Sequence, residues 1–356
     1  MSHGYVPVQI SLRKLFYDAV LIIGIVTYIF AFPAITNAVL TGPQAVTPRI
    51  LEMRTFGTCG FVLLTLILSL GPLARLDRRF LPLVWNRRHF GVIFVGVVVY
   101  HAWKVLDYYH RYGNLETTQS IFTWDVTWTA SSVPFPVLGM VALAIFAVMA
   151  ATSHDFWQAA LGPAVWKWLH MGVYVGYVLV VGHVVLGALQ RESSPLAVGS
   201  VVASVGLVGG LHVLSALKGW SLDRRGIRLV DHDGHRWVAG PLATELLDGH
   251  PVPVNTPKGE VVALVRHGDK ISAMHGVCAH QGGPLSEGRV IDGCLTCPWH
   301  GWQYLPDNGC SPPPFTEKLP TYRVALSSDG AVLVDPTPQP AGTAVEPVML
   351  ATGGAS

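Results

Sequence analysis

"CAHQGGPLSEGRVIDGCLTCPWHGW", residues 278–302, contains two pairs of metal-binding side chains in one short stretch. Cys278 and His280 form the first pair, and Cys297 and His300 form the second. Thiolate and imidazole groups bind zinc and iron–sulfur clusters in proteins. The glycines and prolines around each pair suit two loops that close over one metal centre. The stretch therefore predicts a small domain folded around two ligand loops.

The kind of metal follows from the ligand set. Structural zinc sites use four ligands in a tetrahedral array, typically with Cys-x2–4-Cys spacing. Cys294 and Cys297 offer this spacing, and the set could be completed by Cys278 and Cys310. Both histidines would then have no role, whereas a Rieske centre binds one iron through two cysteines and the other through two histidines. The residue types and spacing therefore favour a [2Fe-2S] cluster with the ligands Cys278, His280, Cys297 and His300.

These motifs also resemble a known family. "CAHQGGPL" with "CPWHGWQY" resembles the Rieske signature, and "DNGCSPPP" resembles the proline-bearing third loop of that family. Quinol-oxidising members carry a disulfide between the ligand loops, but here Gly283 and Trp299 stand in those places. A serine whose hydroxyl is commonly donated to the cluster is replaced by Trp302, although Tyr304 could donate instead. Because hydrogen bonds to the sulfurs raise the reduction potential, we expect a potential below that of the quinol-oxidising type.

Short β-type runs surround the motif and predict a small all-β domain over residues 227–337. The runs are separated by turn residues and lie at 261–265, 271–274, 322–326 and 331–334. The stretch "DHDGH" (231–235) could suggest a metal site, but Asp-Gly between two such runs favours a hairpin turn.

The segments that flank this domain are expected to have no fold of their own. Residues 218–226 are predicted to be a linker, and residues 338–356, rich in Pro, Ala and Gly, a disordered tail. The cysteines outside the proposed ligand set are interpreted as packing residues, namely Cys59, Cys294 and Cys310.

Residues 1–217 have the composition of a membrane domain. The whole chain is 51% hydrophobic and 13% charged, whereas soluble domains carry about 25% charged residues. A spanning helix needs about 20 mostly apolar residues. Six segments qualify: Leu15–Leu40, Phe56–Leu73, Phe90–Tyr109, Pro134–Ala151, Val165–Leu189 and Leu196–Leu217. The predicted fold class is therefore a bundle of six transmembrane helices followed by the small all-β domain.

Basic residues in the connections predict the orientation. Twelve lysines and arginines lie on the side that holds both chain ends, and four lie on the other, namely Arg49, Arg54, Arg111 and Arg191. Positively charged loops stay in the cytoplasm. We therefore expect a multi-pass protein of the cytoplasmic (inner) membrane whose termini and β domain are cytoplasmic. The first apolar run is too long for a cleaved signal peptide.

Histidines within the predicted spans are candidate haem ligands, because polar residues in a membrane are costly and usually functional. His170 and His183 lie in the fifth span about 20 Å apart along the axis, a separation that suits two haems. His101 lies in the middle of the third span and His89 at its start. Histidines at span ends, such as His212, are interpreted as interfacial residues.

The context of these histidines resembles the ferric reductase-like transmembrane family, which binds haem b. The resemblance rests on "RRHFGVIFVGVVVYHAW" and "TSHDFWQAALGPAVWKWLHMGVYVGYVLVVGH". It implies that His101, His170 and His183 occupy ligand positions. Since His101 and His183 lie at similar depth, we expect them to bind one haem toward the outer side. His170 would serve an inner haem, for which His89 is a candidate partner, and a second haem is left open.

The two parts together predict a membrane-bound electron-transfer oxidoreductase. Electrons would pass between the cytoplasmic cluster and haem b. A soluble reductase or ferredoxin would be the donor, and ferric iron, a quinone, dioxygen or a periplasmic redox protein the acceptor. A redox-sensing or accessory subunit of a larger complex is the alternative, and an external β domain fed by quinol is a further one.

Other functions are not expected. We find no oxygenase domain with mononuclear iron, no glycine-rich dinucleotide loop, and no basic stripe with interleaved aromatics that would indicate nucleic acid.

Overall fold

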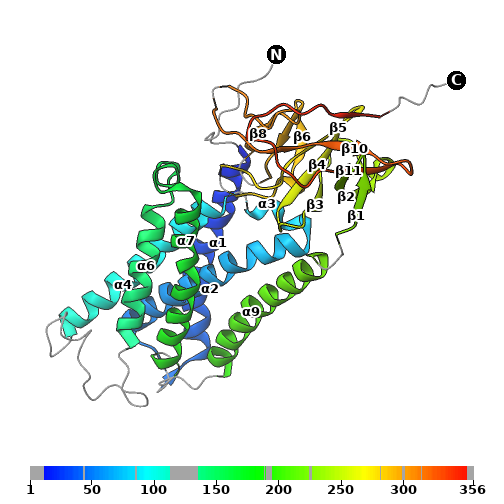
Figure 1. Ribbon diagram of the computed structural model, residues 1–356. Coiled ribbons are helices and arrows are strands. Elements are labelled where there is room, and N and C mark those ends of the chain that lie inside the picture. The colour runs from blue at the N-terminus through cyan, green and yellow to red at the C-terminus, as the bar shows by residue number, and fades with distance from the viewer. Residues whose placement is uncertain are drawn as a thin grey trace. The chain divides into compact units, whose positions relative to one another are not determined.

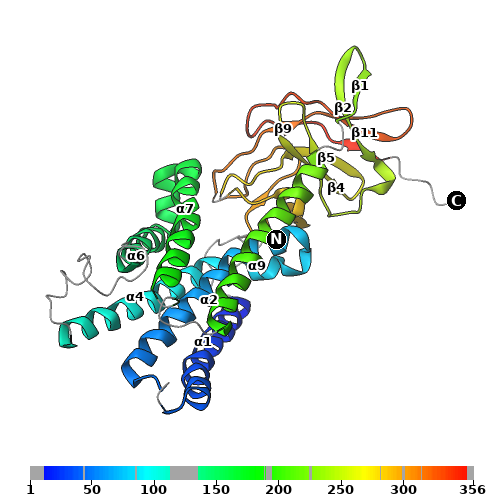
Figure 2. The same cartoon turned by 90° about the horizontal axis from the view of Figure 1, so that it is seen from below.

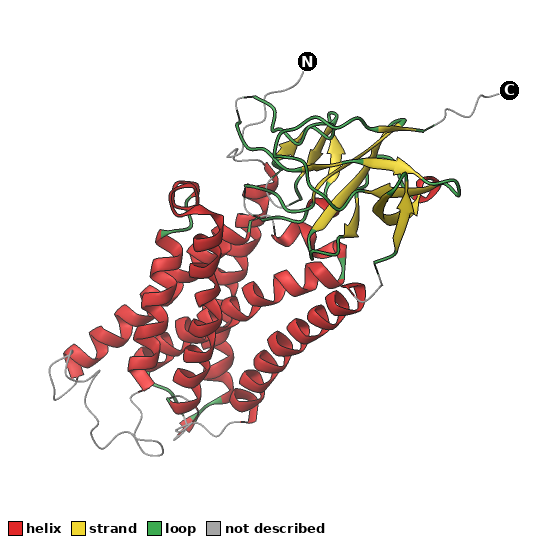
Figure 3. Ribbon diagram, in the orientation of Figure 1, coloured by secondary structure: helices red, strands yellow, loops and turns green. Residues whose placement is uncertain are grey.

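The chain divides into a helical unit and a β unit. The boundary between the two units lies at Leu217 and Lys218. The computed structural model describes residues 12–42, 45–84, 86–112, 135–187, 189, 195–223, 227–280, 282–298, 301–313 and 315–350. Long helices belong to the first unit and strands to the second (Figure 3). This division confirms the predicted fold class.

Six main helices are described in the first unit. They are α1 (Leu12–Val39), α2 (Pro48–Leu76), α4 (Arg87–Tyr112), α6 (Phe135–Ala151), α7 (Asp155–Leu186) and α9 (Pro195–Asp223) (Figure 1). The short segments η2 (Arg78–Phe80) and α3 (Leu81–Val84) lie between α2 and α4. Five of these six helices are long and apolar enough to cross a membrane, and α6 is an apolar helix of 17 residues. The fourth predicted span, α6, is therefore the shortest of the six main helices.

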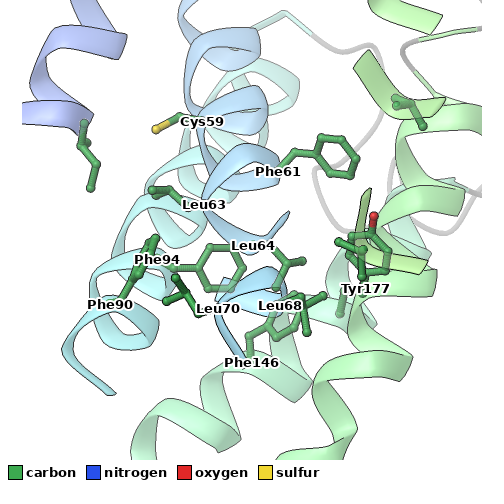
Figure 4. Close-up of a cluster of buried hydrophobic side chains, with 14 residues drawn as sticks. Cys59, Phe61, Leu63, Leu64, Leu68, Leu70, Phe90, Phe94, Phe146 and Tyr177 are labelled. Atoms are coloured by element: carbon green, nitrogen blue, oxygen red, sulfur yellow. The ribbon is translucent and has the colours of Figure 1, made fainter. Parts of the chain in front are cut away.

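Apolar side chains of α2 lie at the centre of this unit. More of α2 is buried than of the other long helices. Its Leu64 lies among Phe94 of α4 and Phe146 of α6 (Figure 4), whose rings meet edge to face with centroids 5.1 Å apart. Gly60 lets α4 approach closely, since a Cβ there would lie 2.5 Å from Val98. The main helix pairs are α2 with α4 and α6 with α7, the second of which is plain in Figure 2.

The β unit consists of three antiparallel sheets. The first contains, in order, β1 (Leu229–His232), β2 (His235–Leu242), β11 (Ala331–Val334) and β10 (Val324–Leu326). The second contains β12 (Val348–Met349), β5 (Lys270–His275), β4 (Val261–His267) and β3 (Val252–Asn255), with β9 (Thr321–Tyr322) also paired with β5. The third contains β6 (Arg289–Ile291), β7 (Cys294–Thr296) and β8 (Gln303–Tyr304). The four predicted runs are all strands, the third one divided between β9 and β10.

Hairpin turns carry the glycines that the sequence placed between strands. Asp233 and Gly234 join β1 to β2 with φ angles of 49° and 74°. Asp292 and Gly293 join β6 to β7 with φ angles of 51° and 76°. Two successive residues with positive φ form the turn whose twist matches that of the flanking strands. The interpretation of "DHDGH" as a hairpin is therefore confirmed.

The segment after residue 337 differs from the expected disordered tail. Residues 338–350 follow a defined path, and β12 pairs with β5 through Val348 and Ile271. The N–H of Leu350 donates to the carbonyl of Asp269 at 2.7 Å. The disorder prediction was wrong for these residues because the edge of β5 supplies hydrogen-bond partners that the composition does not reveal. Residues 351–356 lie outside the described part.

The predicted linker is shorter than expected at its start. Helix α9 continues to Asp223, so residues 218–223 belong to a helix. The remaining linker residues, 224–226, lie outside the described part of the chain.

Candidate metal and haem sites

The first ligand loop follows β5 and contains Cys278 and His280. The N–H of Cys278 donates to the carbonyl of Gly283, and the N–H of Gly282 donates back to the carbonyl of Cys278, both at 2.8 Å. Gly282 has a φ of 71°, which a residue with a side chain rarely adopts. Val277 and Pro284 form a β-bridge that closes the base of the loop.

The second ligand loop joins β7 to β8 and repeats this pattern. The N–H of Cys297 donates to the carbonyl of Trp302 at 2.7 Å, and the N–H of Gly301 donates to the carbonyl of Cys297 at 2.9 Å. Gly301 has a φ of 74°. Each loop thus begins with a cysteine whose backbone is tied across the turn in the same way. Two of the residues predicted to matter here, His300 and Trp299, lie outside the described residues, so His300 as a ligand stays a prediction.

Tyr304 lies beside the first cysteine. Its hydroxyl oxygen is 3.4 Å from Cys278 Sγ and accepts a hydrogen bond from the N–H of Ala279 at 3.0 Å. Since that N–H occupies one acceptor position of the hydroxyl, the phenolic hydrogen stays available for a thiolate at Cys278, which can only accept. Burial raises the pKa of Tyr304, with the nearby Cys278 adding to the effect, so the phenol keeps its proton. The hydroxyl is therefore placed to donate to a thiolate.

The indole of Trp302 stacks on the imidazole of His280. The two rings stack with centroids 4.1 Å apart and an interplanar angle of 9°. Trp302 Nε1–H donates to Ser311 Oγ at 3.0 Å, and Phe315 packs on the indole with centroids 4.7 Å apart. The proline-bearing third loop thus holds the indole that orients His280. Sequence reasoning missed Ser311 and Phe315, whose only signal was their place in and beside "CSPPP".

The ligand set fits a Rieske cluster better than zinc. All four cysteines of the zinc alternative lie within the described residues, where no group of three Cys, His, Asp or Glu side chains could hold one metal ion. A Rieske cluster requires only two protein ligands for each iron. Cys278 and Cys297 are both buried, and both interact with Tyr304.

The two extra cysteines of this unit fit packing roles. Burial raises the pKa of the Cys294 thiol, which keeps it protonated and unreactive. Cys310 Sγ lies 3.9 Å from the carbonyl oxygen of Gly342. Neither Cys294 nor Cys310 forms a disulfide with another described residue.

His101 and His183 are held in the same way in the helical unit. His101 Nδ1 is 2.9 Å from the carbonyl oxygen of Met53, and His183 Nδ1 is 2.7 Å from that of Phe135. A carbonyl can only accept, so each Nδ1 carries the hydrogen and each Nε2 keeps its lone pair for a metal. Haem-binding histidines are commonly fixed by such a second-shell bond. The two imidazoles are also close enough to interact electrostatically.

A glycine faces each of these imidazoles. A Cβ at Gly57 of α2 would lie 2.9 Å from His101 Cε1, and one at Gly139 of α6 would lie 2.8 Å from His183 Nδ1. Real Cβ atoms do not approach other atoms so closely. Both positions therefore require glycine, and these two residues were missed in the sequence because helix glycines are common in membrane spans.

His170 and His89 have different surroundings. His170 Nδ1 is 3.0 Å from the carbonyl oxygen of Trp166 in its own helix, and its ring stacks on Trp166 with centroids 3.8 Å apart. Its Nε2 is buried and has no hydrogen-bond partner in the described part of the chain. His89 Nδ1 is 2.8 Å from Asp18 of α1, and its side chain is 51% exposed. Their roles as ligands of an inner haem stay predictions, and the contact with α1 counts against His89.

His212 has partners of its own. Its Nδ1 is 2.8 Å from the carbonyl oxygen of Val208, and its Nε2 is 3.0 Å from the hydroxyl of Tyr174. Both ring nitrogens are thus hydrogen-bonded, which agrees with its interpretation as a residue without a ligand role.

A charged cavity of about 80 Å³ lies between the start of α2 and the end of α4, near His101. It is lined by Arg49, Glu52, Met53, Lys104, Asp107, Tyr108 and Tyr112. Lys104 pairs with Glu52 at 2.9 Å, and Arg111 pairs with Asp107 at 2.7 Å. Lys104 and Asp107 thus each pair with a different residue. Met53, whose carbonyl anchors His101, belongs to this lining.

Comparison with known proteins identifies two families in the chain. Residues 56–181 match the ferric reductase like transmembrane component, and residues 236–323 match the Rieske [2Fe-2S] domain.

Similar proteins share only part of this chain. The chain is 42% identical over 77 residues to the anthranilate 1,2-dioxygenase ferredoxin subunit of Burkholderia cepacia, covering 21% of this chain and 68% of that protein. It is 39% identical over 69 residues to cholesterol 7-desaturase nvd 1 of Ciona intestinalis, covering 19% of this chain and only 15% of the desaturase. A solved complex of reduced oxygenase and oxidized ferredoxin in carbazole 1,9a-dioxygenase contains a chain with 27% identity and a TM-score of 0.27, covering 29% of this chain and 95% of that one.

Proposed function

We propose that this chain, which joins a ferric reductase-like transmembrane component to a Rieske [2Fe-2S] domain, passes electrons between the cluster and a b-type haem in the membrane. It is a multi-pass membrane protein with the domains of a redox protein. The observation that carries the proposal is the matched anchoring of His101 and His183, each through Nδ1 to a backbone carbonyl. This arrangement leaves the Nε2 lone pair of each imidazole available, so His101 and His183 would be able to hold a haem iron.

The residues of the β unit would hold the cluster as follows. Cys278 and Cys297 bind one iron, and His280 and His300 bind the other. The Tyr304 hydroxyl donates to Cys278 Sγ, and Trp302 fixes the ring plane of His280. The cluster supplies a one-electron couple, and these side chains set its potential and shield it from water.

The residues of the helical unit would hold the haem through matching contacts. His101 and His183 donate Nδ1–H to Met53 and Phe135, which fixes the imidazole planes and raises the basicity of each Nε2. Gly57 and Gly139 leave room beside the rings. Haem b supplies a one-electron Fe(III)/Fe(II) couple within the apolar bundle.

Donor and acceptor are assigned from charge and position. The excess of basic residues on the side of the chain ends supports a cytoplasmic Rieske domain, where a soluble reductase or ferredoxin would deliver electrons. The cavity beside Met53 is the place at which an acceptor would approach the haem from the other side. Its cations Arg49 and Lys104 and its tyrosines suit a quinone or an anionic ferric chelate.

Electron transfer in proteoliposomes tests this function. Reduction of the cluster should be followed by reduction of the haem at catalytic rates, measured by stopped-flow absorbance. His183→Ala should lose the haem and keep the cluster, and Cys278→Ala should lose the cluster and keep the haem. Haem that stays oxidised beside a reduced cluster would instead favour a sensing or accessory subunit.

A further inference from the structure

The helix pairs α2–α4 and α6–α7 share one internal geometry. In each pair, a histidine donates Nδ1–H to a carbonyl that lies 48 residues earlier in the chain. In each pair, a glycine four residues after that carbonyl packs on the imidazole. The corresponding residues are Met53 and Phe135, Gly57 and Gly139, and His101 and His183, each separated by 82 positions.

A constant separation of three positions, which make the same two contacts in each pair, indicates two copies of one helix-pair unit. Few side chains are shared at this separation, although Val98 matches Val180 and Val99 matches Val181 beside the histidines. Each residue near a predicted haem ligand in the pair α6–α7 therefore corresponds to the residue 82 positions earlier in the pair α2–α4. Since any side chain at Gly57 or Gly139 would meet an imidazole, the glycines and histidines are the positions that the shared geometry constrains.

The counterpart of His170 in α4 is Arg88, which lies 82 positions earlier and 13 before His101, as His170 lies 13 before His183. Both Arg87 and Arg88 lie close enough to His170 to interact with it electrostatically. A guanidinium is always protonated and has no lone pair for a metal. His89 is one residue away, which turns it about 100° round the helix, and it contacts Asp18 of α1.

His170 is anchored differently from the other two histidines, although the backbone of Met149 in α6 also interacts with its ring. Its Nδ1 bond goes to Trp166 in the same helix, and Trp166 covers one face of the imidazole. We infer that this end of the bundle does not bind a bis-histidine haem, and that the chain holds one such haem, between His101 and His183. The inference rests on the haem of the proposed function and fixes its number. A redox group at the other end would need ligands other than a histidine pair.

The presence of Arg88 where a second histidine would be needed concerns one particular end of the bundle. Successive spans alternate in direction, so Arg88 near the start of α4 and His170 in the first half of α7 lie toward the end of the bundle at which α9 finishes. That end leads into the Rieske domain. Within the helical unit, about 20 Å of helix length separates His170 at this end from His183 at the His101–His183 position.

Haem counting in the purified full-length chain tests this inference. We expect the wild type to contain one haem for each Rieske cluster, with one low-spin bis-histidine EPR signal. Arg88→His should place a second imidazole opposite His170 and add a second low-spin haem. Adding His170→Ala to that variant should remove the gain.

The outcomes separate this inference from the function on which it rests. Two bis-histidine signals in the wild type would overturn the inference and leave the proposed function intact. No gain in Arg88→His, in a protein that keeps the His101–His183 signal, would overturn the register of the two copies. A wild type without haem would overturn the proposed function itself. A wild type with one signal and a gain that depends on His170 is the expected result.

Discussion

Removal of the Tyr304 hydroxyl should change the reduction potential of the cluster without removing any of its ligands. Tyr304→Phe removes a hydrogen bond to Cys278 Sγ and keeps the buried ring. Such a bond is worth about 1 kcal/mol, so its loss should lower a one-electron reduction potential by about 40 mV. A redox titration followed by EPR measures the shift.

Tyr322→Phe is the matched control for this change. Tyr322 is equally buried but bonds to Glu260 and belongs to another group of buried side chains. The potential should stay unchanged there. An unchanged potential in Tyr304→Phe as well would mean that the phenol does not donate to the cluster.

Two partly buried histidines should make the Rieske domain sensitive to acid. Burial lowers the pKa of His267, which the Asp307 carboxylate only partly offsets, and burial likewise lowers the pKa of His275. Above about pH 6.5, the usual histidine pKa, both are neutral in the folded and unfolded chain. Below it the unfolded chain binds protons first, so stability falls as the pH drops toward the folded pKa values.

Melting temperatures of the Rieske domain between pH 7.5 and pH 5.5 check this sign. The double change His267→Gln and His275→Gln should flatten the fall, whereas His235→Gln, at an exposed position of β2, should not. An equal slope in all three proteins would place the acid sensitivity elsewhere.

At the scale of elements, the glycine of α6 should control haem binding through α7. Gly139→Ala places a methyl group 2.8 Å from His183 Nδ1 and pushes the imidazole off its carbonyl partner. Loss of such second-shell support weakens binding about tenfold or more. The haem-to-cluster ratio at limiting haem gives the measurement.

Gly96→Ala in α4 provides the comparison, because a Cβ there meets nothing within 4 Å. It should keep the wild-type haem content and, as alanine favours helix, leave the fold intact. If both variants bind haem equally well, the close approach of Gly139 is not part of the site.

Strand β12 should stabilise the Rieske domain from outside its predicted limits. Truncation after Thr343 removes the pairing with β5 and the packing of Val348 and Leu350 on the core. We expect a melting temperature several degrees lower, as a loss of about 1 kcal/mol produces in a domain of this size. Truncation after Leu350, which keeps β12, should have no such effect, and equal melting of both would show that the strand adds nothing.

At the scale of the whole molecule, the basic residues should decide which side the Rieske domain occupies. Protease added to sealed inside-out vesicles should remove the domain, and right-side-out vesicles should protect it. Cluster EPR of the released fragment identifies the product. Protection in inside-out vesicles would reverse the direction of the proposed electron flow.

Much of this architecture is written in short stretches of sequence. Ligand type and spacing around Cys278 and Cys297 are local, and so are runs of apolar residues long enough to cross a membrane. Alternating residues and Asp-Gly turns likewise predicted the hairpins of the β domain. These features depend on residues that are close together in the sequence, so they can be predicted without knowledge of the tertiary structure.

Contacts between residues that are far apart in the sequence depend on the tertiary structure alone. Nothing near His101 or His183 in the sequence points to a carbonyl 48 residues away or to the glycine that faces each ring. The apparent disorder after residue 337 was wrong for β12 because the edge of β5 lies far away in the sequence. The sequence by itself thus determined which cofactors this protein can bind, and packing between helices and strands decided which side chains are positioned to hold them. The physical reason is that a ligand needs only its own chemistry to be recognised, whereas orientation depends on groups that folding brings together.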